Sequence, residues 1–373
     1  MPASTTALPP GAASALPTSM GPSPSPSVSP SVTRLPGAAA STQPGAAVGG
    51  GLVAGNPAGR AAVPAAAAAV DTSHPTRVVG SGTPASCTSA AVVAAVAAGG
   101  IITFSCGPNP VIITMTATAR VVNAASPQVV IDGGGLVTLN GAGHRRILYL
   151  DTCDKAQGWT TSHCDDQETP SLTVQNLTFA NGNSTGDTAE GGGGGAILVR
   201  GGQFRIVHSA FVTNTCDPAG PDLGGAAIRV LDQYQDRPVY VVNSTFTGGS
   251  CSNGGALSSI GVSWTVLNSV FRNNKAIGRG ANPASSGTPG GGSGGAIYND
   301  GNQMALRIAG SILENNSAVE GGGAVFFVSN NKTGTLTIEN STLRGNPSAG
   351  FETSPGIYFN SSGKPSVSTS TIS

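Results

Sequence analysis

The densest group of chemically capable side chains lies between Asp151 and Glu168. Five of the chain's 18 acidic residues fall in this segment, and Cys153 and Cys164 flank its middle. Carboxylate oxygens are the hard ligands that Ca²⁺ prefers, so a loop closed by these cysteines predicts a calcium site. Its candidate ligands are Asp151, Asp154, Asp165, Asp166 and Glu168. We favour the alternative, an acidic surface loop that a disulfide stabilises and that binds no metal.

Several other residues bear on whether the chain could bind or cleave a polysaccharide. Trp159 lies in the same segment, where its ring could stack on a sugar or pack against the loop itself. Hydrolysis needs two carboxylates on one face, but Asp165 and Asp166 lie in the cysteine-flanked segment without a partner in the repeats. The bases that a lyase would need are expected to point outward into solvent; they are Arg200, Arg205, Arg229 and Lys275. We therefore predict no catalytic residues and no cofactor, although calcium could bind the acidic segment.

Six cysteines indicate the compartment. None forms a CxxC pair or lies beside a histidine at zinc-ligand spacing. Pairing between sequence neighbours predicts three disulfides, with buried free thiols as the alternative. The expected pairs are Cys87–Cys106, Cys153–Cys164 and Cys216–Cys251. Disulfides predict an extracellular or cell-surface protein, although the first 20 residues lack the basic start and apolar core of a signal peptide.

Composition excludes two other classes of protein. The formal net charge is zero and no block of Lys or Arg occurs, which argues against nucleic-acid binding. No apolar run is long enough for a transmembrane helix. The 55 glycines and only 10% charged residues fit short strands joined by tight turns.

A surface glycan or a protein on a host or cell surface is the expected partner of this chain, and a monomer is its expected oligomeric state.

Two regions precede the repeats. Residues 1–80 hold 13 of the 26 prolines and no aromatic residue, so we predict a disordered Pro/Ala/Ser-rich tail or tether. Residues 83–373 are predicted to fold, with 83–171 forming a cap and the first coils. Ser86 is expected to cap a short helix that ends at Gly99-Gly100. Strands follow at residues 101–105, 111–116, 129–131 and 136–139, with a turn at 132–135.

A two-part repeat fills residues 172–373. Gly-Gly-Ala steps begin at residues 194, 224, 254, 294 and 322, which are 30, 30, 40 and 28 residues apart. Each precedes an alternating strand and a Ser-x-(Phe/Ile/Leu)-x-x-(Asn/Gly) motif, as in Ser269-Val-Phe-Arg-Asn-Asn274. A fixed unit with variable inserts is typical of a solenoid whose coils stack in parallel. The last motif stops at Ser373, so we expect a truncated C-terminus.

If the coils stack, equivalent side chains of successive repeats are predicted to form one apolar column and one hydrogen-bonded ladder. Phe211, Phe246 and Phe271, continued by Leu313 and Leu343, are expected to form an apolar column inside the tube. The turn asparagines are expected to form a hydrogen-bonded ladder; they are Asn214, Asn274, Asn316 and Asn346.

The pairing of Gly194-Gly-Ala-Ile197 with Phe211-Val-Thr-Asn214 resembles the repeats of chlamydial polymorphic outer membrane proteins. It is also similar to the broader group of bacterial right-handed β-helix repeat proteins with a pectin-lyase-like fold. The segment from Val129 to Gly141 looks like the early coils of such proteins. The resemblance implies an all-β, right-handed parallel β-helix that is secreted or held at the outer membrane surface.

These observations favour a non-catalytic adhesion or glycan-contact scaffold. Its specificity is expected to lie in the inserts Asp217–Leu223 and Gly278–Gly292, because loops vary where stacked coils do not. Two alternatives stay open: a polysaccharide lyase or glycoside hydrolase of the same fold, and a structural spacer.

Overall fold

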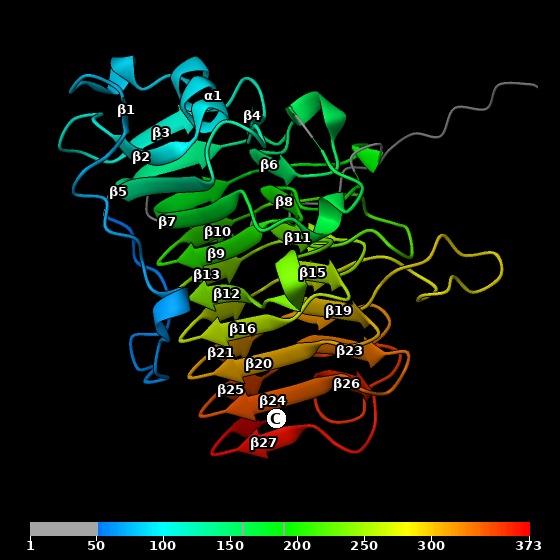
Figure 1. The fold of residues 1–373 in the computed structure, drawn as a ribbon. Coiled ribbons are helices and arrows are strands. Elements are labelled where there is room, and N and C mark those ends of the chain that lie inside the picture. The colour runs from blue at the N-terminus through cyan, green and yellow to red at the C-terminus, as the bar shows by residue number, and fades with distance from the viewer. Residues whose placement is uncertain (1–50, 159, 189–190) are drawn as a thin grey trace, which may run out of the picture. The chain divides into compact units, whose positions relative to one another are not determined.

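The computed structural model describes residues 51–158, 160–188 and 191–373. This part of the chain is rich in β-strands, which pair in parallel, and contains one α-helix. Figure 1 shows the strands stacked from α1 (Ser89–Ala98) at one end to β27 (Ser366–Ser368) at the other. Stacked parallel strands are compatible with the predicted β-helix.

The large sheet contains 17 strands. Those before the regular repeats are β1 (Arg77–Val79), β2 (Gly100–Phe104), β3 (Val111–Thr114), β5 (Gln128–Asn140) and β7 (Ser171–Ala180). The repeats add β9 (Gln203–Val207), β10 (Ala210–Val212), β12 (Val239–Val242), β13 (Thr245–Thr247), β16 (Trp264–Leu267), β17 (Val270–Arg272), β20 (Ala305–Ala309), β21 (Ile312–Glu314), β24 (Thr335–Glu339), β25 (Thr342–Arg344), β27 and β28 (Thr371–Ile372).

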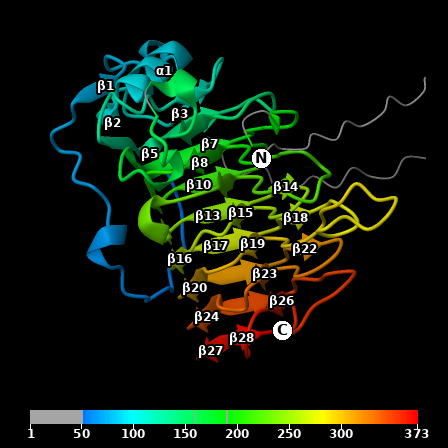
Figure 2. The ribbon, with the colours of Figure 1, turned by 45° about the vertical axis from the view of Figure 1, so that its right-hand side comes forward.

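Two smaller sheets complete the stack. The eight-stranded sheet consists of β4 (Ala119–Arg120), β6 (Leu148–Asp151), β8 (Ile197–Arg200), β11 (Ile228–Val230), β15 (Leu257–Ile260), β19 (Ile297–Gly301), β23 (Val325–Ser329) and β26 (Ile357–Asn360). The three-stranded sheet consists of β14 (Ser250–Cys251), β18 (Lys275–Ala276) and β22 (Ser317–Ala318), visible in Figure 2. One repeat, here called a coil, supplies one strand to the eight-stranded sheet and two to the large sheet.

The predicted apolar column is confirmed. Phe211 pairs in register with Phe246, and Phe246 with Phe271, with ring centroids 4.6 Å and 4.7 Å apart. Phe179 extends the column by one ring, at 5.1 Å from Phe211. Leu313 and Leu343 continue it in the later coils, and all of these side chains are buried in one core.

The asparagine ladder is also present, with one interruption. Asn274 Nδ2 donates to Asn316 Oδ1 at 2.8 Å, and Asn316 Nδ2 to Asn346 Oδ1 at 2.9 Å. The position between Asn214 and Asn274 belongs to Gly249, whose backbone N–H donates to Asn274 Oδ1 at 3.0 Å. The ladder satisfies buried backbone and amide groups at the turns.

A second ladder, of serines, was not predicted. The backbone N–H of each serine donates to the hydroxyl of its equivalent in the next coil, at 3.0–3.1 Å. Its members are Ser209, Ser244, Ser269, Ser311, Ser341 and Ser370. The recurring Ser of the motif is therefore a structural residue of each turn.

The N-terminal helix differs from the prediction at its first residue. Thr88, and not Ser86, caps α1, because its hydroxyl accepts from Ala91 N at 3.2 Å. Ser86 ends a short 3-10 turn and its hydroxyl donates to Thr83 O at 2.6 Å. Gly99 closes the helix with a positive φ of 66°, as expected. Val92 and Val96 enter the common core, so α1 covers the first coil.

Two predicted strands merge into one. Residues 129–131 and 136–139 belong to β5, which continues through Gly133, Gly134 and Gly135. The pairing of β5 with β7 shifts register between Asp132 and Val137, so the glycines form a bulge and not a chain reversal.

The prediction of disorder through residue 80 is wrong for residues 51–80. Residues 51–76, here called the strap, lie along the outside of the large sheet, in blue in Figures 1 and 2. Strand β1 then pairs with β2 in register from Arg77 with Ile102. The strap is ordered despite its composition, because hydrogen bonds to the sheet hold it in place of the burial of large side chains of its own. Residues 1–50 lie outside the described residues.

All three predicted disulfides are present and no described cysteine is free. Such bonds form and persist in oxidising compartments, which suggests an extracellular location. Within the described residues, no helix has the length and apolar character needed to cross a bilayer.

Candidate ligand-binding site

The predicted acidic segment is stapled by Cys153–Cys164, but its first two carboxylates are already engaged. Asp151 Oδ1 accepts from Cys153 N at 2.7 Å, and burial raises the pKa of Asp151. Asp154 caps a 3-10 turn by accepting from Ala156 N at 2.9 Å. The Tyr149 hydroxyl lies 3.1 Å from the Asp154 carboxylate and 3.4 Å from that of Asp151.

Among the described residues, the other three acidic side chains form no metal-ligating group with this pair. Asp166 Oδ1 accepts from Gln235 N at 2.7 Å, and the Glu168 side chain is exposed. In the described part of the chain, one group of three metal-ligating atoms lies within 4.8 Å, formed by Asp165 and the sulfurs of Cys153 and Cys164. Those sulfurs are bonded to each other, so the five carboxylates do not meet and calcium binding stays a prediction. Trp159 lies outside the described residues.

A different site is a hollow on the outer face of the large sheet. It is lined by Ala66, Ser171, Gln203, Phe204, Arg205, Gln233, Arg237, Pro238 and Tyr240. Outward side chains of β9 and β12 form its floor, because Arg205 and Tyr240 are register partners in these parallel strands. Ala66 belongs to the strap, which forms one wall.

Arg205 is partly enclosed in this hollow. Its Nε donates to Thr173 Oγ1 at 2.9 Å and its Nη1 to Ala66 O at 2.9 Å. Burial lowers the pKa of Arg205, although an arginine stays protonated at neutral pH. Arg205 points outward from the sheet, as expected, but the strap covers part of its side chain.

Arg237 supplies a second cation. Its Nη1 donates to Gln203 Oε1 at 3.0 Å, and its guanidinium carbon lies 5.1 Å from the centroid of the Tyr234 ring. Neither Arg237 nor Arg205 forms an ion pair with any carboxylate among the described residues. Two cations without counter-ions in one hollow favour an anionic ligand.

The hollow also offers an aromatic ring and amides. The Tyr240 ring is partly exposed beside Arg205. Gln233 is buried and fixed, since its Oε1 accepts from Phe204 N at 2.8 Å and its Nε2 donates to Asp232 O at 2.8 Å. A ring beside fixed donors suits a sugar, which presents an apolar face and hydroxyl groups. None of the lining side chains is a carboxylate or an imidazole.

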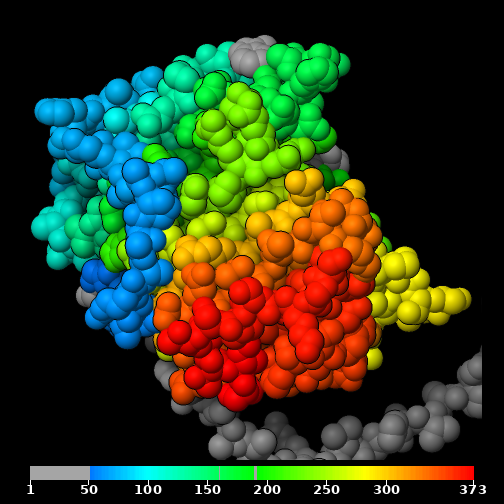
Figure 3. All heavy atoms as spheres, turned by 60° about the horizontal axis from the view of Figure 1, so that its bottom comes forward, coloured from blue at the N-terminus to red at the C-terminus, as the bar shows by residue number. Residues whose placement is uncertain are grey.

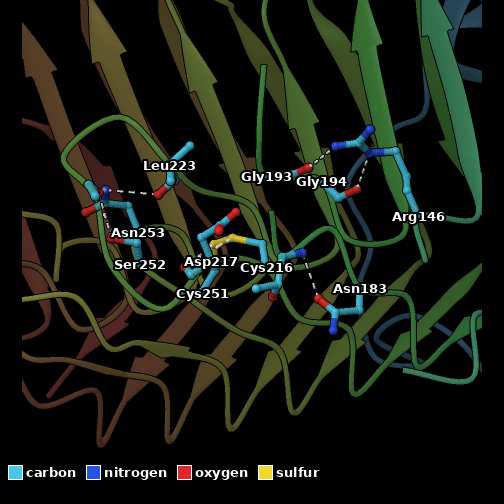
Figure 4. The surroundings of a disulfide bond; sticks show 12 residues. Arg146, Asn183, Gly193, Gly194, Cys216, Asp217, Leu223, Cys251, Ser252 and Asn253 are labelled. Atoms are coloured by element: carbon cyan, nitrogen blue, oxygen red, sulfur yellow. Dashed lines mark hydrogen bonds between the residues drawn. A yellow bond between two sulfur atoms is a disulfide. The ribbon is translucent and has the colours of Figure 1, made fainter. Parts of the chain in front are cut away.

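The predicted inserts lie on another side of the molecule. In Figure 4 the Cys216–Cys251 disulfide joins neighbouring coils beside the first insert, and Asn253 Nδ2 donates to Leu223 O at 3.1 Å. The longer insert protrudes, as Figure 3 shows in yellow. Its Asn282 Nδ2 lies 3.1 Å from Asp222 Oδ1, so the two inserts touch.

Arg229 lies close enough to the first insert to feel the charge of Asp222. It is 4% exposed, and its Nε and Nη1 have no hydrogen-bond partner. Burial lowers the pKa of Arg229 to about 10, while the negative charge of Asp222 raises it. Arg229 was expected to be solvated; it is buried instead, which repeat spacing alone could not reveal.

Comparisons with known proteins return no similarity. No protein-family model, no curated protein and no solved structure matches the chain.

Proposed function

We propose that this chain is a non-catalytic right-handed parallel β-helix protein, secreted or at a cell surface, that binds anionic glycans. The stacked parallel strands and the Gly-Gly-Ala repeats support the fold. The resemblance of those repeats to polymorphic outer membrane proteins and pectin-lyase-like proteins supports the class. Three disulfides support the location.

The hollow around Arg205 and Arg237 is the observation that carries the ligand assignment. A guanidinium group donates two parallel hydrogen bonds to a carboxylate or a sulfate. Tyr240 lies beside these cations, where a sugar ring can pack against its face. Acidic sugars of a polysaccharide present both features together, whereas a neutral glycan leaves both charges without partners.

Binding and cleavage are tested with the same polysaccharides. Pectate, alginate and chondroitin sulfate are the anionic probes and xylan is the weakly charged comparison, each incubated with the full chain with and without Ca²⁺. We expect at least one anionic probe to bind in a salt-dependent manner and to keep its chain length. Shortening of any probe would replace this proposal by a lyase or hydrolase, and binding to none would leave a structural spacer.

The Arg205→Gln variant tests whether the anionic glycan binds at the hollow. It is expected to weaken binding about tenfold, since one charge-assisted contact is lost. Arg307→Gln is the matched control, because Arg307 occupies the same outward row on β20 but pairs with Glu339 at 2.6 Å. Equal losses in both variants would show non-specific attraction to positive charge and contradict a site at the hollow.

A further inference from the structure

The strap follows a defined path across several coils. Its Asn56 N donates to Asn268 O at 2.7 Å, and Asn56 Nδ2 to Gly310 O at 2.8 Å. Ala61 exchanges two hydrogen bonds with the Asn268 side chain, at 2.8 Å and 3.0 Å. Val70 exchanges two more with that of Gln175, both at 2.9 Å. Asn268 and Gln175 lie on different coils, so the strap bridges them.

Two glycines allow this close approach. A Cβ atom on Gly59 would lie 2.6 Å from Asn268 Oδ1 and 2.7 Å from Gly310 O. One on Gly55 would lie 2.6 Å from the Asn243 carbonyl carbon. These distances are too short for any side chain, so the strap is fitted to this surface and is not a general spacer.

Beneath the strap runs an apolar strip on the outside of the large sheet. Its members are register neighbours in successive coils: Val207, Val242, Leu267 and Ala309. Ala67 packs on them and Ala61 lies at the edge. The next position along the row is Glu339, so the strip ends at Ala309, in the last coil that the strap is seen to contact, through Gly310.

Few side chains of the strap are buried. Between residues 51 and 69, Ala67 is the only fully buried side chain, and Val53 is 89% exposed. Segments with few buried apolar contacts open at lower free energy than the strands of a core. Opening would expose the strip but would leave the pairing of the sheets intact.

The strap also limits the hollow. The Ala66 carbonyl accepts one N–H of Arg205, and Ala66 forms a wall of the cavity. A ligand carboxylate that takes the Nη1 hydrogen now held by the Ala66 carbonyl would displace that carbonyl. A ligand bound in this way and strap closure oppose each other at one side chain.

We propose that the strap is a releasable latch, whose closed state restricts the hollow and whose opening favours the anionic ligand. This inference rests on the proposed function for the identity of the ligand. Because coupling between two equilibria is reciprocal, an anionic ligand must promote opening to the same extent as opening promotes its binding.

Trypsin cleavage after Arg60 measures strap opening in the full chain. Arg60 is exposed, but the backbone on both sides of it is held by Asn56 and Asn268. Gly59→Val is expected to dislodge the strap and raise the cleavage rate at Arg60 about fivefold or more. Ala58→Val is the matched control, because Ala58 is exposed and its substitution leaves the strap in place. Each rate is divided by the rate on the urea-unfolded chain.

Pectate then tests the coupling. Gly59→Val is expected to bind pectate about fivefold more tightly than the wild type, and pectate is expected to accelerate cleavage of the wild type at Arg60. Gly55→Val must reproduce the effect, and circular dichroism must show the native β-sheet spectrum for both variants. Pectate binding with unchanged affinity in both variants, or protection of Arg60 by pectate, would overturn the latch alone. Failure of the wild type and both variants to bind any of pectate, alginate and chondroitin sulfate would overturn the proposed function as well.

Discussion

Individual outward side chains of the large sheet differ in whether their charge has a partner. Glu314 is nearly buried between Arg272 and Arg344, and Arg344 Nη2 lies 2.6 Å from its carboxylate. Arg205 and Arg237 have no such neighbour among the described residues. Paired charges in this fold stabilise adjacent coils, whereas unpaired charges mark a place where a ligand can supply the missing one.

Glu314 predicts a pH dependence of stability. Burial alone would raise the pKa of Glu314, but hydrogen bonding to Arg344 and the positive charges of Arg272 and Arg344 lower it below 4.5 overall. A lowered carboxyl pKa stabilises the fold above the unfolded value and loses this contribution as pH falls through the folded value. Glu314→Gln should cost about 1 kcal/mol at pH 7 and flatten the fall in melting temperature below pH 4.5.

Thermal melts between pH 3 and pH 7 check this prediction, with Glu168→Gln as the control because the Glu168 carboxylate is exposed. Identical pH profiles for the wild type and Glu314→Gln would contradict it.

Calcium binding also depends on individual side chains, those of the acidic segment. Asp151 and Asp154 accept hydrogen bonds from their own loop, and Asp166 accepts one from Gln235. We expect millimolar Ca²⁺ to leave the melting temperature unchanged, since no three carboxylates come together among the described residues. A rise in melting temperature that Asp165→Asn abolishes would instead support the metal site predicted from the sequence.

At the scale of elements, one turn departs from the repeat motif because of how it packs against its neighbours. A consensus of the repeats would place asparagine at residue 249, where it would complete the asparagine ladder. Gly249 is required instead, because a Cβ there would lie 1.9 Å from Gly255 O and 3.2 Å from the Ala226 Cβ. The departure from the motif is therefore a consequence of packing between coils.

Gly249→Asn is expected to destabilise the protein by about 2 kcal/mol or more, although consensus substitutions usually stabilise. Urea denaturation monitored by circular dichroism measures the change. Gly345→Asn is the comparison, because a Cβ at Gly345 meets only Asn315 Oδ1, at 3.0 Å, and asparagine tolerates its φ of 59°. A stabilised Gly249→Asn variant would show that the turn can relax.

At the scale of the whole molecule, the stack is held by backbone pairing between coils, by the common core and by covalent links. Cys216–Cys251 joins residues 35 apart in the sequence that lie in consecutive coils. Closing a loop of this length lowers the entropy of the unfolded chain.

The double variant Cys216→Ser/Cys251→Ser should lose about 2 to 4 kcal/mol of unfolding free energy. Urea melts measure this loss, and dithiothreitol, which can reduce all three disulfides, should lower the stability of the wild type by at least as much. A stability difference within error would mean that core packing alone fixes the two coils.

The sequence by itself determined the repeat. Period-two strands, Gly-Gly-Ala steps and stacked Phe and Asn positions are local patterns, and their spacing predicted the column, the ladder and the three disulfides. It did not predict the strap, because residues 51–76 have the composition of a disordered segment and are ordered by the surface that they contact. One signal was present: the doublets Ile206-Val207, Val241-Val242 and Val266-Leu267 place an apolar residue on the outer face. Only the tertiary structure decided that the strap covers this strip and borders Arg205, because such contacts join residues more than 100 positions apart.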